Sequence, residues 1–409
     1  MKTLTLSLLA ASGMAFTTLA IAQPEFDRVE KGRYLAIVGD CAACHTASAD
    51  KPFAGGVPIN TPFGTLVGAN ITPDIATGIG AWSYDDFKRA MSEGIGHGDK
   101  RLYGAMPFTA YTKVTDADNR AIWSYLQTLT PISQQIDSNQ LPFPFRIRTS
   151  LMVWNWMNFE KGEYRQDPGK SEEWNRGAYL VQGLGHCGTC HTPKNILGGD
   201  KNTHFLAGAK VENWWAPNIT AENHEGIGRW SIGEIKDYLR TGVNRYDAAS
   251  GPMAEEVINS SRHWKESDLQ AVAVYLKSLK PGDSSQQKTP QALQTNNAQM
   301  QTGKAIYFDR CSACHTSAGK GAPGIFPQLA DNPLINAAQP TSLMRVVLAG
   351  SRAVGTPARP TAPAMPAFAD TMTDEQVADV LTYIRNSWGN AAPAVSASEV
   401  SRMRNSLKE

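Results

Sequence analysis

The sequence predicts an all-α protein of three tandem domains, the first two of which form a close internal repeat. Three observations support this prediction. The motif C-x-x-C-H occurs three times and uses all six cysteines of the 409-residue chain. The segments around the first two copies align at offsets between 145 and 148 residues. Each copy is followed, after a loop, by an amphipathic helical pattern. A chain of this length is also expected to divide into roughly two to four domains.

The first 22 residues have the features of a secretory signal peptide. One Lys precedes an apolar run that ends at Ala20-Ile21-Ala22, the small-x-small pattern that signal peptidase cuts. We therefore expect a mature chain that begins at Gln23 and works in the periplasm. No later segment reaches the ~20 apolar residues of a transmembrane helix, so a soluble or peripheral protein is expected.

The charge balance argues against nucleic acid as a partner. Lys and Arg together number 39, and Asp and Glu together number 38. The sequence therefore lacks the basic excess that binding to nucleic acid requires.

The C-x-x-C-H motifs admit four interpretations: half of a zinc site, a redox dithiol, a disulfide, or covalent attachment of haem. Zinc sites usually join two C-x-x-C pairs that are close in sequence, whereas these pairs lie 146 and 124 residues apart. A redox dithiol would require a βαβ context, which is absent. A disulfide within each motif would leave the three histidines unexplained. Haem attachment uses the whole motif, because two thiols bond the porphyrin and the adjacent imidazole binds iron. The predicted attachment residues are Cys41, Cys44, Cys187, Cys190, Cys311 and Cys314, and the predicted iron ligands beside them are His45, His191 and His315.

A six-coordinate haem iron needs a second axial ligand, and three methionines recur at suitable positions. Met106 in "YGAMPF" and Met253 in "SGPMAE" lie 147 residues apart, in register with the repeat. Met365 in "APAMPAF" repeats the small-Met-Pro pattern of the first. We predict these three as iron ligands, each carried by a loop. The other candidates have contexts that favour core packing or, for histidine, surface and hydrogen-bonding roles; they are Met91, Met344, Met372, His97, His204, His224 and His263.

Two asparagines and two tryptophans also recur between the first two units. Asn70 and Trp82 of the first unit match Asn218 and Trp230 of the second. Each offers an N–H donor that a haem propionate could accept. A shared loop structure would explain the recurrence equally well, so both interpretations stay open.

Each unit is predicted to close with an amphipathic helix. The pairs Thr115–Asp118, Ser267–Gln270 and Thr373–Gln376 have the spacing of a helix N-terminal cap. The predicted segments are a signal peptide (1–22), domain 1 (23–145), a connector (146–170), domain 2 (171–282), a polar linker (283–300), domain 3 (301–390) and a tail (391–409). The aromatic residues that lead into and through the connector indicate either packing between domains or a strap against a partner subunit or the membrane interface.

Several long phrases give the chain a resemblance to a known family. They include "KPFAGGVPINTPFGTLVGANITPD", "LPFPFRIR", "EWNRGAYLVQGLGHCGTCHTPKN" and "GPMAEEV". The chain resembles the three-haem cytochrome c subunits of bacterial membrane-bound dehydrogenases, such as gluconate 2-dehydrogenase and quinoprotein alcohol dehydrogenase. The resemblance implies three class I cytochrome c domains with three covalently bound haem c groups. It also implies a partner dehydrogenase subunit, either a flavoprotein or a quinoprotein, a small third subunit, and ubiquinone or a cytochrome as electron acceptor. The complex is expected at the periplasmic face of the inner membrane, although no membrane anchor is evident near the C-terminus.

Together these features predict an electron-transfer subunit without a catalytic site of its own. The chain has no dinucleotide-binding, P-loop or hydrolytic signature, so substrate oxidation is expected on another polypeptide. By resemblance, the substrate is a sugar acid such as gluconate, or an alcohol. Two alternatives stay open: service to a molybdenum hydroxylase or aldehyde dehydrogenase, and a haem enzyme with an open iron site. Three register-matched methionines argue against the second alternative.

Overall fold

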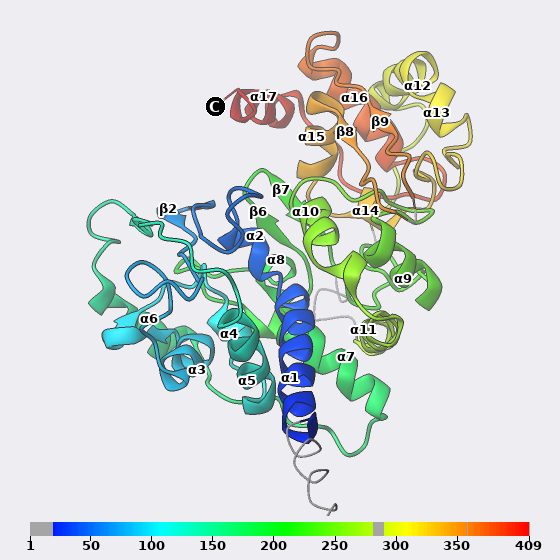
Figure 1. Ribbon diagram of the computed structural model, residues 1–409. Coiled ribbons are helices and arrows are strands. Elements are labelled where there is room, and N and C mark those ends of the chain that lie inside the picture. The colour runs from blue at the N-terminus through cyan, green and yellow to red at the C-terminus, as the bar shows by residue number, and fades with distance from the viewer. Residues whose placement is uncertain (1–18, 281–289, 358, 409) are drawn as a thin grey trace, which may run out of the picture.

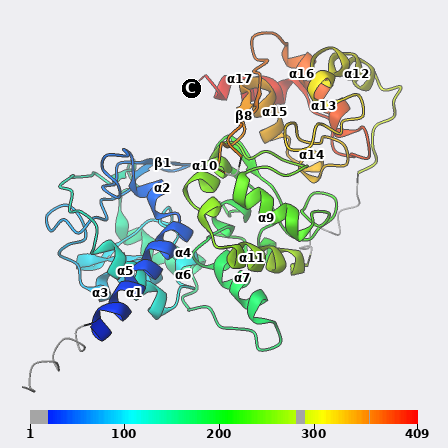
Figure 2. The ribbon, with the colours of Figure 1, turned by 45° about the vertical axis from the view of Figure 1, so that its right-hand side comes forward.

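The fold consists of helical units joined by long loops and short hairpins. A computed structural model describes residues 19–280, 290–357 and 359–408. Most of the predicted signal peptide and part of the predicted linker therefore lie outside the described residues. Figures 1 and 2 show the segment coloured yellow to red as a separate lobe above the blue-to-green part of the chain.

Three helix pairs form the framework. Helix α1 (Leu19–Val38) packs on α5 (Asp116–Leu126), α7 (Glu172–Gln182) on α11 (Glu266–Ser278), and α12 (Ala298–Arg310) on α16 (Asp374–Arg385). All three pairs cross in the same way, because a glycine of the first helix lies against a backbone carbonyl of the second. A Cβ atom at these glycines would lie 1.8, 2.0 and 2.1 Å from the oxygen; the pairs are Gly32–Ala121, Gly177–Ala271 and Gly303–Asp379.

Shorter elements make up the rest of the described chain. The remaining α-helices are α2 (Cys41–His45), α3 (Tyr84–Glu93), α4 (Phe108–Tyr111), α6 (Leu151–Asn158), α8 (Gly188–His191), α9 (Ile232–Thr241), α10 (Pro252–Asn259), α13 (Ser312–His315), α14 (Pro333–Asn336), α15 (Thr341–Ala349) and α17 (Ala397–Ser406). Four small antiparallel sheets, which the all-α prediction did not include, close the loops. Their strands are β1 (Pro58–Thr61), β2 (Gly64–Val67) and β5 (Asn139–Gln140); β3 (Ile95–Gly96) and β4 (Lys100–Arg101); β6 (Ala209–Val211) and β7 (Trp214–Ala216); and β8 (Ser351–Arg352) and β9 (Ala364–Met365).

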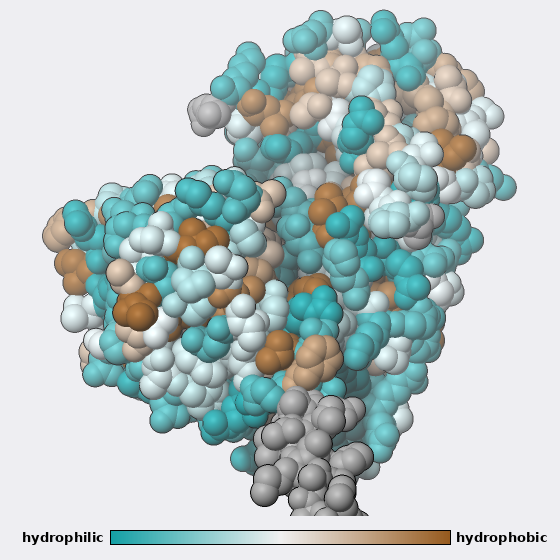
Figure 3. Space-filling view, in the orientation of Figure 1, coloured by the Kyte–Doolittle hydropathy of each residue, from teal (hydrophilic) through white to brown (hydrophobic). Residues whose placement is uncertain are grey.

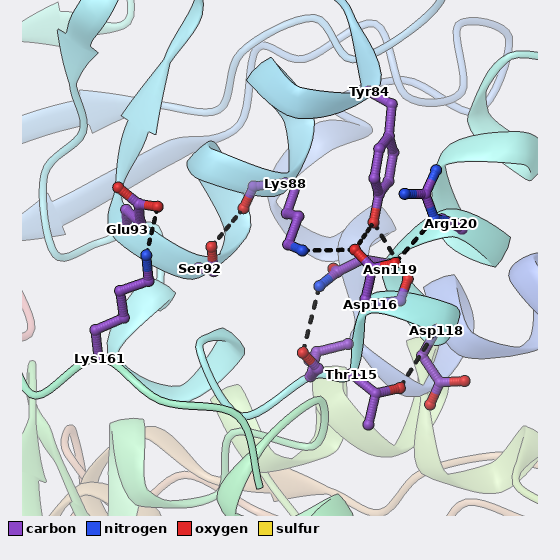
Figure 4. Close-up of polar contacts among 11 residues, drawn as sticks. Tyr84, Lys88, Ser92, Glu93, Thr115, Asp116, Asp118, Asn119, Arg120 and Lys161 are labelled. Carbon is purple, nitrogen blue, oxygen red and sulfur yellow. Dashed lines mark hydrogen bonds and ion pairs between the residues drawn. The ribbon is translucent and has the colours of Figure 1, made fainter.

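Polar contacts attach α3 to α5 in the first helix pair (Figure 4). The Asp116 carboxylate accepts hydrogen bonds from Tyr84 Oη at 2.8 Å, Lys88 Nζ at 2.6 Å and Arg120 Nε at 2.8 Å. These partners hold the pKa of Asp116 well below its usual range. Lys161, in the predicted connector, pairs with Glu93 at the end of α3 at 2.7 Å. This ion pair joins the segment that follows α6 to helix α3 of the first unit.

The first two helix pairs share one hydrophobic core and a reciprocal polar interface. Tyr34 of α1 donates to Asp268 of α11 at 2.6 Å, while Tyr179 of α7 donates to Asp118 of α5 at 2.6 Å. A cation completes each side. Arg176 pairs with Asp268 at 2.8 Å, and Lys31 pairs with Asp118 at 2.6 Å. The tyrosines and the cations each lie 145 residues apart in sequence, so the two halves of the interface use equivalent positions.

The third unit has its own core and docks against the second. Asn332 Nδ2 donates to Tyr246 O at 2.7 Å, and Gln328 N donates to Arg245 O at 2.8 Å. Ser342 Oγ accepts from Trp215 N at 2.8 Å, which joins α15 to β7. The predicted tail contains helix α17, whose Val400 is fully buried against the third core.

The predicted helix starts are correct in two units and wrong in one. Thr115 caps α5, and Thr373 forms a capping box with Gln376 at the start of α16. Helix α11 instead begins at Glu266 after Lys265, so Ser267 lies inside the helix and does not cap it. The amphipathic helix predicted to close the third unit is confirmed in α16. The residues of its apolar stripe are at most 6% exposed; they are Val377, Val380, Leu381 and Ile384.

Candidate functional site

The three motif histidines share one hydrogen-bonding arrangement. Each lies at the last position of a short helix, α2, α8 or α13. Each ring places Nδ1 against a backbone carbonyl: His45 against Ala69 O at 2.6 Å, His191 against Pro217 O at 2.7 Å and His315 against Pro327 O at 3.1 Å. A carbonyl can only accept, so Nδ1 carries the proton and Nε2 is left with a lone pair. This is the tautomer and orientation in which a histidine binds a metal through Nε2.

Burial keeps these imidazoles neutral. It lowers the pKa of His45, His191 and His315, although the hydrogen bond to the carbonyl acts in the opposite direction. A neutral imidazole is the form that binds iron. The histidines are therefore in the protonation state required for ligation at neutral pH.

The six cysteines form no disulfides with one another, are at least partly accessible and lie near the histidines in sequence. Burial raises the pKa of Cys41 and Cys187 to about 12 and that of Cys44 and Cys311 to about 11. The disulfide interpretation is thus not supported. Within the described residues, no group of three or more His, Cys, Asp or Glu side chains is placed to hold a metal ion.

The threonine after each motif closes the next loop. Thr46 Oγ1 accepts from Phe53 N at 2.9 Å, Thr192 Oγ1 from Leu206 N at 3.1 Å and Thr316 Oγ1 from Lys320 N at 3.1 Å. The repeated "CHT" therefore has a structural role in all three units.

The three predicted methionine ligands lie in different local structures. Met106 is in a loop two residues before α4, as expected. Met253 is instead the second residue of α10, because Pro252 is a favourable first helical residue. Met365 ends the two-residue strand β9 and pairs with Ser351. All three are half-buried. By contrast, the methionines assigned to core packing are at most 6% exposed, as predicted; they are Met91, Met344 and Met372.

The recurring asparagines and tryptophans divide between the two interpretations. Asn70 Nδ2 donates to Thr77 Oγ1 at 3.1 Å and to Ile132 O at 2.7 Å, so both of its N–H bonds are used within the protein. Asn70 and Asn218 both accept from the threonine two residues later, which favours the loop-structure interpretation. Trp230 differs, because its Nε1 is buried without a protein partner. Among these residues, Trp230 best fits a donor to an absent acceptor.

The first two motifs lie against each other. Tyr111 Oη donates to Gly39 O at 2.8 Å, and its ring meets the edge of His186 with centroids 5.6 Å apart. Burial, followed by the nearby Asp40 and Cys190, raises the pKa of Cys44. Asp40 and Glu256, which the sequence did not single out, lie near the cysteines of the first two motifs. Burial raises the pKa of Asp40 to about 8 and that of Glu256 to about 7.

The remaining predicted roles are mostly confirmed. His97 pairs with Asp86 at 3.1 Å, His204 with Thr203 at 2.9 Å, and His263 with Arg262 at 2.9 Å. His224 differs, since its Nε2 is buried without a partner. The glycines at the helix crossings were overlooked, although their place eight to ten residues before the first cysteine of each motif is visible in sequence.

These residues fit a covalently attached haem in chemical terms. Each unit offers two free thiols, a neutral imidazole with a free Nε2, and a half-buried thioether on a different element. The thiols suit porphyrin attachment, and the imidazole and thioether suit the two axial positions of haem iron.

Comparison with known proteins agrees with this chemistry. The sequence model of the Cytochrome c family matches residues 29–130 and 300–388. The gluconate 2-dehydrogenase cytochrome c subunit of Pantoea cypripedii is 40% identical, over 96% of this chain and 92% of the relative. This chain belongs to the family of cytochrome c subunits of bacterial dehydrogenases. The cytochrome c subunit of the quinone alcohol dehydrogenase of Gluconobacter oxydans is 36% identical, over 92% of this chain and 82% of the relative. A nicotinate dehydrogenase subunit of Pseudomonas putida is 41% identical over 90% of this chain, which covers 31% of that longer protein.

Membership of this family defines the general role of the chain. It is an electron-transfer subunit of a dehydrogenase complex, binds haem c covalently, and leaves substrate oxidation to another subunit. Within the described residues, no helix combines the length and apolar character needed to cross a membrane.

Proposed function

We propose that this cytochrome c subunit carries three haem groups, one in each helical unit, and relays electrons from a catalytic subunit to a membrane quinone. The observation that carries this proposal is the threefold recurrence of one local arrangement. In each unit a C-x-x-C-H helix follows a glycine-containing helix crossing, and the histidine Nδ1 faces a carbonyl. The same arrangement supports three tandem class I cytochrome c domains, at 23–145, 171–282 and 301–390, the first two a close repeat.

In this proposal the residues of each unit have distinct roles. The cysteines hold the haem covalently, the histidines bind iron through Nε2, and Met106, Met253 and Met365 bind iron on the opposite side. Filled axial positions let haem iron exchange one electron without binding substrate. The carbonyls of Ala69, Pro217 and Pro327 keep the imidazoles oriented. Trp230 is proposed to donate to a propionate, because its Nε1 is buried without a protein partner.

The contacts between units support a continuous relay. The first two motifs are close enough for their thiols to influence each other, and hydrogen bonds hold the third unit against the second. Short, fixed separations favour electron transfer between haems.

The partners are proposed from the relatives. A flavoprotein or quinoprotein dehydrogenase acting on a sugar acid such as gluconate, or on an alcohol, is the favoured donor. A small third subunit and ubiquinone or a cytochrome acceptor complete the complex, at the periplasmic face of the inner membrane. The similarity to the nicotinate dehydrogenase subunit keeps a different class of dehydrogenase partner as the second candidate.

The relay is tested with the mature protein purified from a host that attaches haem c. A pyridine haemochrome assay should give three haems per chain. The protein alone should not be reduced by gluconate or alcohols, but should be reduced once the co-encoded catalytic subunit is added, and reoxidised by a ubiquinone analogue. Rapid reduction by substrate without the partner would contradict the relay, and two haems or fewer in fully matured protein would contradict the ligand assignment.

A further inference from the structure

The connector between the first two units carries an exposed apolar face. Six side chains at and near α6 are each more than half exposed, from 55% to 94%; they are Phe143, Met152, Val153, Trp156, Met157 and Ile196. We call this set the α6 patch. In Figure 3 hydrophobic surface is visible on the left side of the molecule, where Figure 1 draws α6.

Packing between domains accounts for only part of the connector. Trp154 meets the edge of Phe108 with centroids 6.2 Å apart and donates from Nε1 to Leu197 O at 2.7 Å, and Phe159 also packs on Phe108. These inward side chains hold α6 in place. Trp156 instead points outward and is 85% exposed. Trp156 thus exposes a large apolar ring to water on a helix that inward contacts hold in place. Exposed apolar surface of this kind indicates a site where another molecule binds.

The patch is assembled from two separate segments of the chain. Asn195 Nδ2 donates to Asn158 Oδ1 at 2.7 Å, which brings the loop containing Ile196 against the end of α6. Phe63 packs on Phe145 with centroids 5.2 Å apart and also lies close to Gly198. Apolar residues of both units therefore meet on one face, which a chance exposure of one helix would not produce.

The charge around the patch favours lipid as the occupant. Between Ser138 and Phe159, a segment flanked by Asp137 and Glu160, the only charged residues are Arg146 and Arg148. Arg148 is half-buried over the Tyr103 ring, at 4.8 Å, whereas Arg146 is exposed. An uncharged apolar face with tryptophan and a basic edge is the composition of segments that lie in the interface of an anionic bilayer.

We infer that the α6 patch inserts into the interfacial layer of an anionic membrane and sets how the cytochrome lies on it. This inference rests on the proposed relay to a membrane quinone and adds the surface that would face the bilayer. Trp154 lies 3.4 Å from the Cβ position of Gly104, two residues from Met106, and shares a small cavity with Thr189 of the second motif. Insertion of α6 would therefore bring the cofactor regions of the first two units towards the bilayer.

The test measures flotation of the haem-loaded protein with phosphatidylcholine vesicles, with and without phosphatidylglycerol. Replacing both exposed residues in Met152→Ser/Trp156→Ser should weaken vesicle binding roughly tenfold or more. Arg146→Gln should weaken binding roughly fivefold, and only to vesicles that contain phosphatidylglycerol. Ile75→Ser is the matched control, because Ile75 lies outside the patch and its exposure (77%) is between those of Met152 (55%) and Trp156 (85%). This variant should bind as the unmodified protein does.

Two results would overturn the inference. One is unchanged vesicle binding by the double variant. The other is normal vesicle binding together with weakened association with the catalytic subunit, which would assign the patch to a protein partner. Unaltered haem spectra would confirm that the variants are folded. Vesicle binding is measured without an electron donor, so failure of the proposed relay would appear in the reduction assay and leave this test unaffected.

Discussion

At the scale of single residues, each candidate site pairs a motif histidine with a backbone carbonyl that is distant in sequence. The C-x-x-C-H spacing placed each histidine at the end of one helical turn, and the structure adds the carbonyl that orients it. The motif could not indicate those carbonyls, because they come from residues 12 to 26 positions later. Repeat register identified Met253 as a candidate but wrongly suggested a loop, because Pro252 starts a helix there.

The proposed ligation predicts a specific effect of removing a methionine. Met365→Ala should remove one of three methionine-to-iron charge-transfer signals and let one haem of the reduced protein bind carbon monoxide. The potential of that haem should fall by an amount on the order of tenths of a volt, within the ~0.8 V range that axial ligands set. Spectra and a redox titration check this result. Met344→Ala, in the same core but assigned to packing, should leave the spectra unchanged and cost about 2–5 kcal/mol of stability. Equal carbon monoxide binding by the unmodified protein would show that the iron was already open.

At the scale of elements, the helices were predictable and their crossings were not. Apolar periodicity and caps define α16, since those signals are local. The crossings depend on close approach of residues about 76 to 94 positions apart, for example Gly177 and Ala271. The reciprocal contacts of Tyr34 with Asp268 and of Tyr179 with Asp118 join residues 234 and 61 positions apart. Contacts between residues this far apart leave no periodic pattern in the sequence. The interface between the first two units could therefore not be predicted from it.

The shared crossing predicts that its glycines tolerate no side chain. In Gly177→Ala the new Cβ would lie 2.0 Å from Ala271 O and 2.8 Å from Tyr275 Cβ, so α7 and α11 must separate. We expect a loss of about 1–3 kcal/mol or more in the free energy of unfolding, measured with urea. Gly233→Ala in α9 is the control, because the nearest atom to its Cβ position is Ser231 Oγ at 3.8 Å. That change should be neutral or stabilise by up to about 1 kcal/mol. Equal stability of both variants would mean that the crossing is loosely packed.

The interface between the first two units should weaken in acid. Burial opposes ionisation of Asp268, but hydrogen bonds from Arg176 and Tyr34 outweigh it and lower the pKa of the carboxyl. A folded-state pKa below the unfolded value of ~3.9 stabilises the fold above that pH, and the contribution is lost as pH falls through the folded pKa. Asp268→Asn should cost about 1–3 kcal/mol at neutral pH, discounted because Arg176 is partly exposed, and should flatten the fall in stability below pH ~4. Asp237→Asn, on the exposed side of α9, controls for the lost charge. An unchanged acid profile in Asp268→Asn would exclude this carboxyl as the cause.

At the scale of the whole molecule, the proposed relay depends on how the third unit is held. The described residues show the third unit held against the second unit by buried side chains. Asn332 is 2% exposed, and its Nδ2 donates to Tyr246 O at 2.7 Å and to Gln328 O at 2.6 Å. Its Oδ1 accepts from Leu334 N at 2.9 Å and so caps α14. One side chain thus combines a local role, which sequence can suggest, with a role between units, which it cannot.

Asn332→Asp separates these two roles. The carboxylate keeps the cap of α14 but cannot donate, and it places a negative charge beside two carbonyl oxygens. Leaving such groups unpaired costs about 1–3 kcal/mol, so the third unit should spend time away from the second. We expect electron exchange between the third haem and the other two to slow several-fold after rapid photoreduction, with the three potentials unchanged. Asn297→Asp is the matched control, since Asn297 only accepts hydrogen bonds at the exposed start of α12. Unchanged kinetics in Asn332→Asp, in a variant shown by small-angle scattering to be more extended, would mean that electrons do not pass through this interface.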